Sequence, residues 1–279
     1  MPEKKVTSLV WFRNNLRVID NLSLKKSVEN SDKVIGYINI DPNIIKSTSY
    51  GFKKTEKFRI KFLLESISDL KKQLDRINIS LVVKNEDLKS SINSVISKYK
   101  IDNIYIQKEW TRDEILEEEN IPSNVNLIKD FDQFLFSPSD VSGIYENIPR
   151  GFSNFRKKCE KLLSIDDIVT SPKPLSKTNL INEEYSIPSL SELGYEEFEV
   201  HKDSAFKFLG GETHGIDRVN EYFFESKNLS KYKLTRNGLL GKDYSSKISS
   251  WLANGSLSVK YVYSQIKNYE NTVEKNDST

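Results

Sequence analysis

The sequence predicts an α/β fold with a parallel sheet in its first half, followed by a long irregular segment and a helical region. Three observations support this. Five short apolar runs alternate with polar or helix-periodic stretches up to about residue 130. Pro, Ser, Asn and Gly then interrupt any periodicity as far as residue 200, and apolar residues recur at helical spacing afterwards. A chain of 279 residues is long enough for two ordinary domains.

The five runs are the expected strands: TSLVWF (7–12), KVIGYINI (33–40), ISLVVK (79–84), NIYIQ (103–107) and VNLI (125–128). Continuous apolar strands separated by helices indicate a parallel sheet that is covered on both faces. A ligand in such a sheet binds at the carboxyl ends of the strands, which draws attention to RNNLRVIDN, DPN and KEWTRDE. No G-x-G-x-x-G or P-loop motif follows these strands, which excludes an ordinary dinucleotide or ATP domain on motif grounds.

The longest expected helix lies within residues 54–76. Its predicted buried stripe consists of Phe58, Phe62, Leu63, Ile67, Leu70 and Leu74. A short helix is expected at 154–163, inside the irregular segment. In the helical region the apolar residues at helical spacing are Phe206, Leu209, Ile216, Val219, Tyr222 and Phe223. Gly210 and Gly211 predict a break between two helices there.

The composition excludes several classes of protein. The 42 Lys and Arg residues nearly balance 40 Asp and Glu residues, so the overall charge gives no argument for a polyanionic partner. One cysteine, Cys159, rules out an internal disulfide, and two histidines leave no Cys/His cluster for a metal. No apolar stretch reaches membrane-spanning length, and no signal-peptide cleavage site follows the first apolar run. We therefore expect a cytoplasmic protein without a membrane partner.

The segment from Tyr232 to Ser258 carries the strongest chemical pattern. Ser245 and Ser246 precede KISSWLANGSLS, so a serine hydroxyl is expected to cap a helix that begins near Lys247. Capping serines are common, and a plain helix cap is one interpretation. The other adds the ring of Tyr232 and the cations of Arg236 and Lys247, because hydroxyl, amide and cation at a helix N-terminus together suit a pyrophosphate.

Five segments, in order, resemble motifs of the photolyase/cryptochrome family, most closely its cryptochrome-DASH branch. They are VWFRNNLRVIDN, IPRGFSNFRKKCE, IPSLSELGY, FLGGETHGIDRVNEYFFES and YKLTRNGLLGKDYSSKISSWLANGSLS. The resemblance implies a Rossmann-like α/β antenna domain at 1–133, a linker at 134–200, the N-terminal part of an all-α FAD-binding domain at 201–271, and a tail at 272–279. It also implies light-driven repair of cyclobutane pyrimidine dimers in DNA, with a preference for single strands, or blue-light sensing.

The resemblance implies roles for particular residues. Tyr232 and Arg236 match positions beside the FAD phosphates, and the matching phosphate loop consists of Ser245, Ser246, Lys247, Ile248 and Ser249. Glu109 matches a carboxylate that grips a folate antenna, 5,10-methenyltetrahydrofolate, and its alternative interpretation is a surface glutamate among other acids. No residue is assigned to catalysis. Trp11, Trp110 and Trp251 are expected to pack in the core.

The sequence also departs from the family pattern. Ser250 replaces a proline, Ser256 stands where cysteine is frequent, and Lys260 replaces an arginine. Family members continue well beyond the last helix, so the helical domain is expected to be incomplete and the chain inactive by itself. Three hypotheses remain: part of a DASH-type photolyase completed by a second chain, a non-catalytic folate- or nucleotide-binding module, and an inactive remnant. If the helical part is incomplete, the apolar side chains of Leu252, Leu257, Val262 and Ile266 are expected to lack covering partners.

Overall fold

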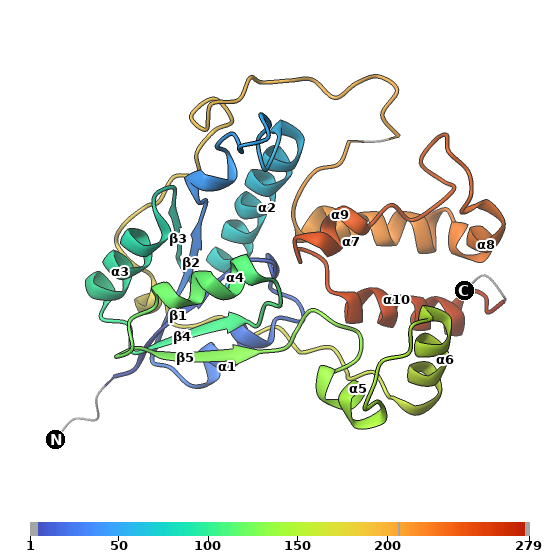
Figure 1. Cartoon of the computed structure of the whole chain (residues 1–279), viewed down its shortest axis with the longest axis horizontal. Helices are drawn as coiled ribbons and strands as arrows, with labels where there is room; N and C mark the ends of the chain where they lie inside the picture. The colour runs from blue at the N-terminus through green and yellow to red at the C-terminus, as the bar shows by residue number, and fades with distance from the viewer. Residues whose placement is uncertain (1–4, 206, 277–279) are drawn as a thin grey trace.

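The computed structural model describes residues 5–205 and 207–276, and its first half is built around a five-stranded parallel sheet (Figure 1). The strands are β1 (Thr7–Trp11), β2 (Lys33–Asn39), β3 (Leu81–Lys84), β4 (Asn103–Gln107) and β5 (Asn126–Asp130). Their order across the sheet is β3-β2-β1-β4-β5, and every neighbouring pair is parallel. All five predicted strands and the parallel arrangement are thus confirmed.

Helices cover both faces of the sheet. Helices α1 (Leu22–Glu29) and α2 (Lys57–Arg76) lie on one face, where Val10, Phe12 and Val34 belong to their core cluster. Helix α3 (Leu88–Tyr99) covers the other face, where Leu9, Trp11 and Ile35 are buried. Successive residues of a strand point to opposite faces, and both faces are buried, so the strands read as continuous apolar runs.

Helix α2 confirms the expected buried stripe at Ile67, Leu70 and Leu74 and departs from it at Phe58 and Phe62. Ile60, Leu64, Ile67, Leu70 and Leu74 face the sheet. Phe58 is 65% exposed, and Phe62 points instead towards the helical part of the chain, where its ring lies 5.6 Å from that of Trp251. The predicted stripe mixed two faces of the helix, because the aromatic face contacts elements remote in sequence.

The irregular segment contains short elements and returns along the sheet. The connection from β4 to β5 contains α4 (Arg112–Glu117) and η2 (Glu118–Asn120). The irregular segment begins after β5 and contains α5 (Pro138–Ile144), α6 (Phe152–Leu162) and η3 (Lys177–Asn179). The expected helix at 154–163 corresponds to α6, and Cys159 within it is buried. The Asn179 side chain accepts from the Val34 N–H at 2.8 Å and donates to the Val34 carbonyl at 3.0 Å. The linker is therefore attached to the sheet.

The helical part forms its own apolar cluster. Its elements are α7 (Glu212–Asn220), the π-turn η4 (Glu221–Glu225), η5 (Asn228–Lys231), α8 (Tyr232–Thr235), α9 (Ser249–Ala253) and α10 (Val259–Thr272). The predicted helix before Gly210 is wrong for residues 207–210, which are not helical, and Phe206 lies outside the described residues. Leu257 and Val262 are buried against Trp251 and Tyr269, so their predicted exposure is also wrong. The uncovered leucines are Leu234, Leu239 and Leu240, each at least 85% exposed.

Two glycines allow the helical part to approach the sheet closely. A Cβ atom at Gly210 would lie 2.0 Å from the Phe62 carbonyl oxygen in α2. Gly255, with φ +66°, sits between α9 and α10, and a Cβ there would lie 1.8 Å from the carbonyl oxygen of Asn14. Only a residue without a side chain fits at either position.

Candidate cofactor sites

The predicted phosphate-binding residues lie in or beside the loop formed by residues 242–249, between α8 and α9. Tyr232 begins α8 and is partly buried, while Arg236 follows α8 and is exposed. The Thr235 hydroxyl donates to the Tyr244 carbonyl at 3.0 Å and so attaches the 242–249 loop to α8. The structure therefore places Tyr232 and Arg236 on the segment next to Ser245 and Ser246.

The residues of the 242–249 loop differ in exposure. Ser245, Ser246 and Lys247 are partly buried, Ile248 is buried and Ser249 is exposed. The Lys247 ammonium lies 3.6 Å from the centre of the Tyr244 ring, a cation–π contact that holds the charge beside the loop. Lys247 itself has φ +55°, a conformation in which the chain turns sharply.

The expected helix cap is wrong. Helix α9 begins at Ser249, two residues after the predicted start, and its N-cap is Ile248, which makes no side-chain capping bond. Ser245 and Ser246 instead remain in the loop because Arg218 binds their carbonyls. With only five residues, α9 contributes little dipole, so the loop itself must provide any anion site.

Arg218 of α7 organises the 242–249 loop, and the sequence pattern did not single it out. Its guanidinium donates to the carbonyls of Ser246 at 2.9 Å, Lys242 at 2.7 Å and Ser245 at 3.2 Å. It also pairs with Glu221 at 2.9 Å, and Glu221 in turn binds Lys242. The hydrogen bond from Lys242 and the Arg218 guanidinium hold the pKa of Glu221 below its usual range.

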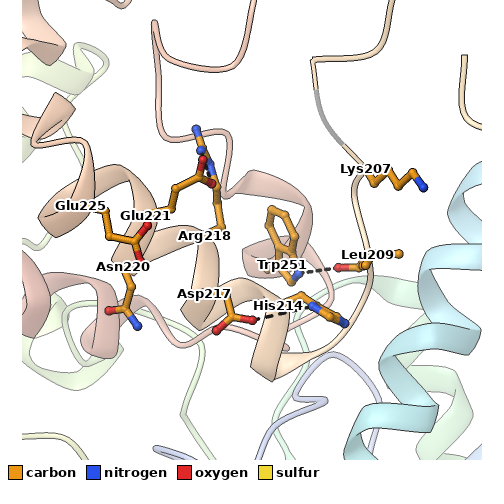
Figure 2. Close-up of a pocket in the computed structure, with 9 residues that line it drawn as sticks. All are labelled: Lys207, Leu209, His214, Asp217, Arg218, Asn220, Glu221, Glu225 and Trp251. Atoms are coloured by element: carbon orange, nitrogen blue, oxygen red, sulfur yellow. Dashed lines mark hydrogen bonds and ion pairs between the residues drawn. The ribbon is translucent and has the colours of Figure 1, made fainter. Parts of the chain in front are cut away.

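A shallow cavity lies beside α7, and Arg218 and Glu221 are among the residues that line it. Figure 2 shows His214, Asp217, Glu221 and Glu225 of α7 and η4 with Trp251 nearby, around a volume of about 400 Å³. Trp251 is buried, and its indole N–H donates to the Leu209 carbonyl at 3.0 Å. Within residues 5–205 and 207–276, no group of three or more His, Cys, Asp or Glu side chains is placed to hold a metal ion.

Glu109 lies at the carboxyl end of β4 and is not a surface glutamate. It is 6% exposed, and its carboxylate accepts from Asn14 at 3.3 Å and from Gln107 at 3.2 Å. Burial raises the pKa of Glu109, against the opposing effect of the nearby Arg13 guanidinium. The next residue, Trp110, is 47% exposed and stacks on Phe131 at 5.3 Å, so its predicted place in the core is wrong, while Trp11 and Trp251 are buried as predicted.

A larger cavity of about 960 Å³ opens at the carboxyl ends of β1 and β2, beside α2 and the linker. The aromatic side chains that line it are Trp11, Phe12, Phe58, Phe62, Phe198 and Phe208. Three further lining residues each carry a buried polar atom without a hydrogen-bond partner in the described chain: Arg13 Nε, Asn39 Oδ1 and Glu114 Oε2. Flat aromatic walls with unpaired donors and acceptors suit a heteroaromatic ligand. The sequence located this edge of the sheet, but Glu109 does not line the cavity.

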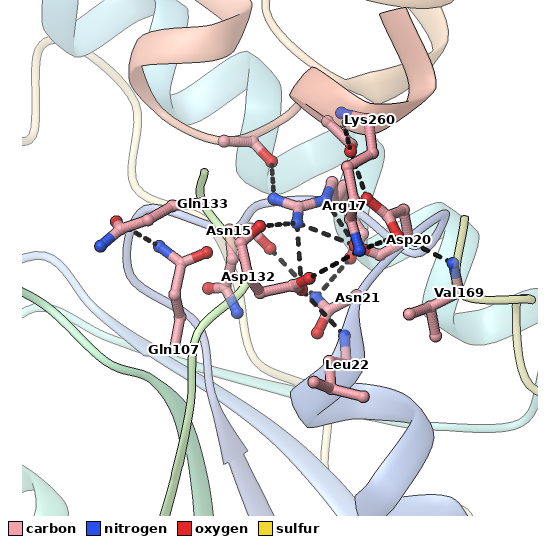
Figure 3. Close-up of polar contacts among 12 residues, drawn as sticks. Asn15, Arg17, Asp20, Asn21, Leu22, Gln107, Asp132, Gln133, Val169 and Lys260 are labelled. Atoms are coloured by element: carbon pink, nitrogen blue, oxygen red, sulfur yellow. Dashed lines mark hydrogen bonds and ion pairs between the residues drawn. The ribbon is translucent and has the colours of Figure 1, made fainter. Parts of the chain in front are cut away.

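A buried charge network connects the sheet to the helical part (Figure 3). Arg17 binds the Asp132 carboxylate at 3.0 Å and the Gly255 carbonyl at 3.1 Å. Lys260, the departure from the family arginine, pairs with Asp20 at 3.1 Å, and the Ser258 hydroxyl binds Asp20 as well. These contacts fix the position of α10 relative to the strand ends.

Glu212 adds a second connection at the start of α7. Its carboxylate accepts from the backbone N–H groups of Val18 at 2.9 Å and Ile19 at 2.8 Å. Burial raises the pKa of Glu212 to about 7, and burial raises that of Asp132 to about 6. The sequence analysis singled out neither carboxyl, although Glu212 lies within a recognised motif and Asp132 does not.

Comparison with known proteins finds similar sequences and structures over nearly the whole chain. A family model described as DNA photolyase matches residues 8–176. The chain is 36% identical over 278 residues to the cryptochrome DASH of Gloeobacter violaceus. This alignment covers 98% of this chain and 55% of the relative. The crystal structure of a Synechocystis sp. cryptochrome matches with a TM-score of 0.90 at 31% identity, over 100% of this chain and 58% of that one.

A more distant structure matches as well. The class III photolyase of Agrobacterium tumefaciens has a TM-score of 0.79 at 20% identity, covers 100% of this chain and 56% of that one, and shows the shared fold. The chain spans about half the length of the curated relatives that it matches. None of the helices in the described residues is both long and apolar enough to span a bilayer. From the family model and the shared architecture, the chain belongs to the DNA photolyase family, with cryptochromes DASH among its relatives.

Proposed function

We propose that this chain contributes the antenna domain and the diphosphate-binding part of a DASH-type photolyase or cryptochrome that carries FAD. One observation supports the flavin site above others. Within the part of the chain that the structure describes, the 242–249 loop gathers the hydroxyls of Ser245 and Ser246, the Lys247 ammonium and backbone N–H groups that donate no hydrogen bond, beside Tyr232 and Arg236. A diphosphate needs this combination of donors and positive charge.

The residues present fit the diphosphate of FAD. Ser245 and Ser246 would donate hydroxyl hydrogen bonds, and Lys247 with Arg236 would neutralise its charge. Tyr232 would border the site through its partly buried ring. A reduced flavin bound there would supply the light-driven electron for splitting a cyclobutane pyrimidine dimer.

The substrate and the partner are part of the same proposal. We propose DNA that contains a pyrimidine dimer, preferably single-stranded, as the substrate, and a second chain that covers the exposed leucines of the helical part as the partner. The exposed Leu234, Leu239 and Leu240 near the 242–249 loop support such a partner, because isolated proteins rarely leave three neighbouring leucines uncovered. Blue-light sensing without repair is the alternative use of the same flavin.

An absorption titration of the purified chain with FAD tests the flavin site. We expect flavin bands to remain with the protein after gel filtration, and Lys247→Met to weaken binding about tenfold through loss of one charge contact. Lys202→Met, an exposed lysine ahead of α7, is the control and leaves the affinity unchanged. Riboflavin, which lacks the diphosphate, should bind equally to both variants. If the chain retains no flavin at any concentration, the proposed site is wrong.

A second ligand in the α/β part is supported by the 960 Å³ cavity and by Glu109. We propose 5,10-methenyltetrahydrofolate as an antenna, with the Glu109 carboxylate binding its aminopyrimidine edge. For this, the carboxylate must exchange its bonds to Asn14 and Gln107 for bonds to the ligand. If the α/β part instead acts as a folate- or nucleotide-binding module without catalysis, the cavity residues Asn39 and Glu114 would bind the ligand.

Two variants separate these positions. With added folate, Glu109→Gln should abolish the near-ultraviolet band of the bound chromophore if Glu109 grips it. Asn39→Leu should abolish the band if the ligand fills the cavity at β1 and β2. If neither variant changes a chromophore band that the unmodified chain shows, both Glu109 and the cavity at β1 and β2 are excluded as the folate-binding site.

A further inference from the structure

The 242–249 loop owes its shape to one buried arginine. Arg218 is 4% exposed, and three carbonyls from the loop converge on its guanidinium, those of Lys242, Ser245 and Ser246. Glu221 holds the remaining side of the guanidinium at 2.9 Å. The fork of donors on an arginine suits this arrangement, because its N–H groups project in one plane at fixed angles.

The carbonyl directions determine the amide directions. In a planar trans peptide the C=O of one residue and the N–H of the next point in opposite directions. The N–H groups of Asp243, Ser246 and Lys247 therefore point away from Arg218. Within residues 5–205 and 207–276, none of these three N–H groups donates a hydrogen bond. Three donors are thus held ready on one side of the loop.

The backbone at the end of the loop adds to this donor surface. Lys247 has φ +55°, and Ile248 follows with φ −84° and ψ −1°. Consecutive residues with φ of opposite sign turn their N–H groups towards a common side and form a concave anion site. The Lys247 ammonium beside the Tyr244 ring brings positive charge to the same segment.

We propose that Arg218 is a positioning residue for diphosphate binding, which orients the amides of the 242–249 loop without contacting the ligand itself. The inference rests on the proposed flavin site. Arg218 binds the carbonyl side of the loop, opposite the amides, and it shares its charge with Glu221, which also binds Lys242. Arg218 affects ligand binding only by fixing the geometry of the loop. A positive charge at position 218 that does not bind the three carbonyls is therefore not sufficient for diphosphate binding.

Ligand affinities of Arg218→Lys and Arg218→Met test the proposal, with FAD, ADP and riboflavin as probes. Lysine keeps the charge but cannot reach three carbonyls together. We expect both variants to bind FAD and ADP about tenfold more weakly or worse, with riboflavin affinity unchanged, because only the diphosphate uses the loop amides. Arg76→Met, at the exposed end of α2, is the matched control. Equal losses for riboflavin and FAD, or full affinity in Arg218→Lys, would overturn the proposal.

A second measurement does not depend on flavin. Trypsin cleaves after Lys242 and Lys247 if the loop opens, and after Lys157 in α6 as an internal reference. We expect cleavage in the loop to become about tenfold faster in both Arg218 variants, with cleavage after Lys157 unchanged. If the unmodified chain binds no FAD but the loop still opens in the variants, the flavin site is wrong and only the role of Arg218 in holding the loop closed stands. Unchanged cleavage in the loop would refute the role of Arg218.

Discussion

At the scale of single residues, buried charge concentrates where the helical part meets the sheet. Arg17, Asp132, Asp20 and Lys260 form one network, and Glu212 caps the N–H groups of Val18 and Ile19. Arg17, Asp20 and Glu212 belong to motifs recognisable in the sequence, whereas Asp132 and Lys260 lie outside those motifs. Their pairing was not predictable, because the partners lie more than a hundred positions apart and no local spacing connects them.

Removing the Glu212 side chain should destabilise the fold. Glu212→Ala leaves two backbone N–H groups without acceptors, each costing about 1–3 kcal/mol. Burying a carboxylate is itself unfavourable, so its removal offsets part of this cost. We therefore expect the free energy of unfolding to fall by roughly 1–3 kcal/mol at neutral pH. Urea denaturation monitored by tryptophan fluorescence measures it. Glu225→Ala, an exposed glutamate just beyond α7, should change stability by less than about 0.5 kcal/mol.

At the scale of elements, strands were predictable and helix faces less so. The five apolar runs became the five strands, because burial on both faces requires continuous apolar sequence. The face of α2 was misassigned at Phe58 and Phe62, whose contacts are with Phe198 of the linker and Trp251 of α9. The cap predicted for α9 failed because Arg218, distant in sequence, holds the serines in the loop.

The turn between α9 and α10 tolerates no side chain at Gly255. In Gly255→Ala the new Cβ would overlap the Asn14 carbonyl, and φ +66° adds backbone strain. We expect the free energy of unfolding to fall by about 3 kcal/mol or more, because the turn must move away from the loop after β1. Thermal unfolding of the variant measures the loss. Gly143→Ala in α5, where nothing lies within 4 Å of the new Cβ, should be neutral or slightly stabilising. Similar melting temperatures for the two variants would contradict the close contact.

At the scale of the whole molecule, the two halves depend on each other. The core of the helical part includes Phe62 of α2, and Gly210 contacts the same helix. Buried carboxyls in this interface, Asp132 and Glu212, retain their protons to higher pH than in an unfolded chain. Assembly of the halves is therefore linked to proton binding.

The free energy of unfolding should fall as pH rises. In the unfolded chain Asp and Glu titrate near pH 4, whereas in the folded chain the pKa is about 6 for Asp132 and about 7 for Glu212. The folded state binds more protons between about pH 4 and 7, so stability is greatest at the acid end of that window and is lost as pH rises through the folded values. We expect a decrease of roughly 2–4 kcal/mol from pH 5 to pH 7.5.

Urea midpoints at several pH values between 5 and 8 measure this dependence. Glu212→Gln has a similar shape but no titrating proton, and it should reduce the slope of stability against pH. Stability that is constant across this range, or that increases with pH, would show that the two carboxyls do not carry raised pKa values.

The sequence by itself determined the strand runs, their parallel arrangement, the family motifs and the edge of the sheet where a cavity opens, because each depends on local pattern or on ordered motifs. Only the tertiary structure decided which face of α2 meets the helical part, that Glu109 is buried between Asn14 and Gln107, and that Arg218 shapes the 242–249 loop. These features arise from contacts between segments far apart in the chain. Close packing and buried hydrogen bonds select them, and no local spacing encodes either.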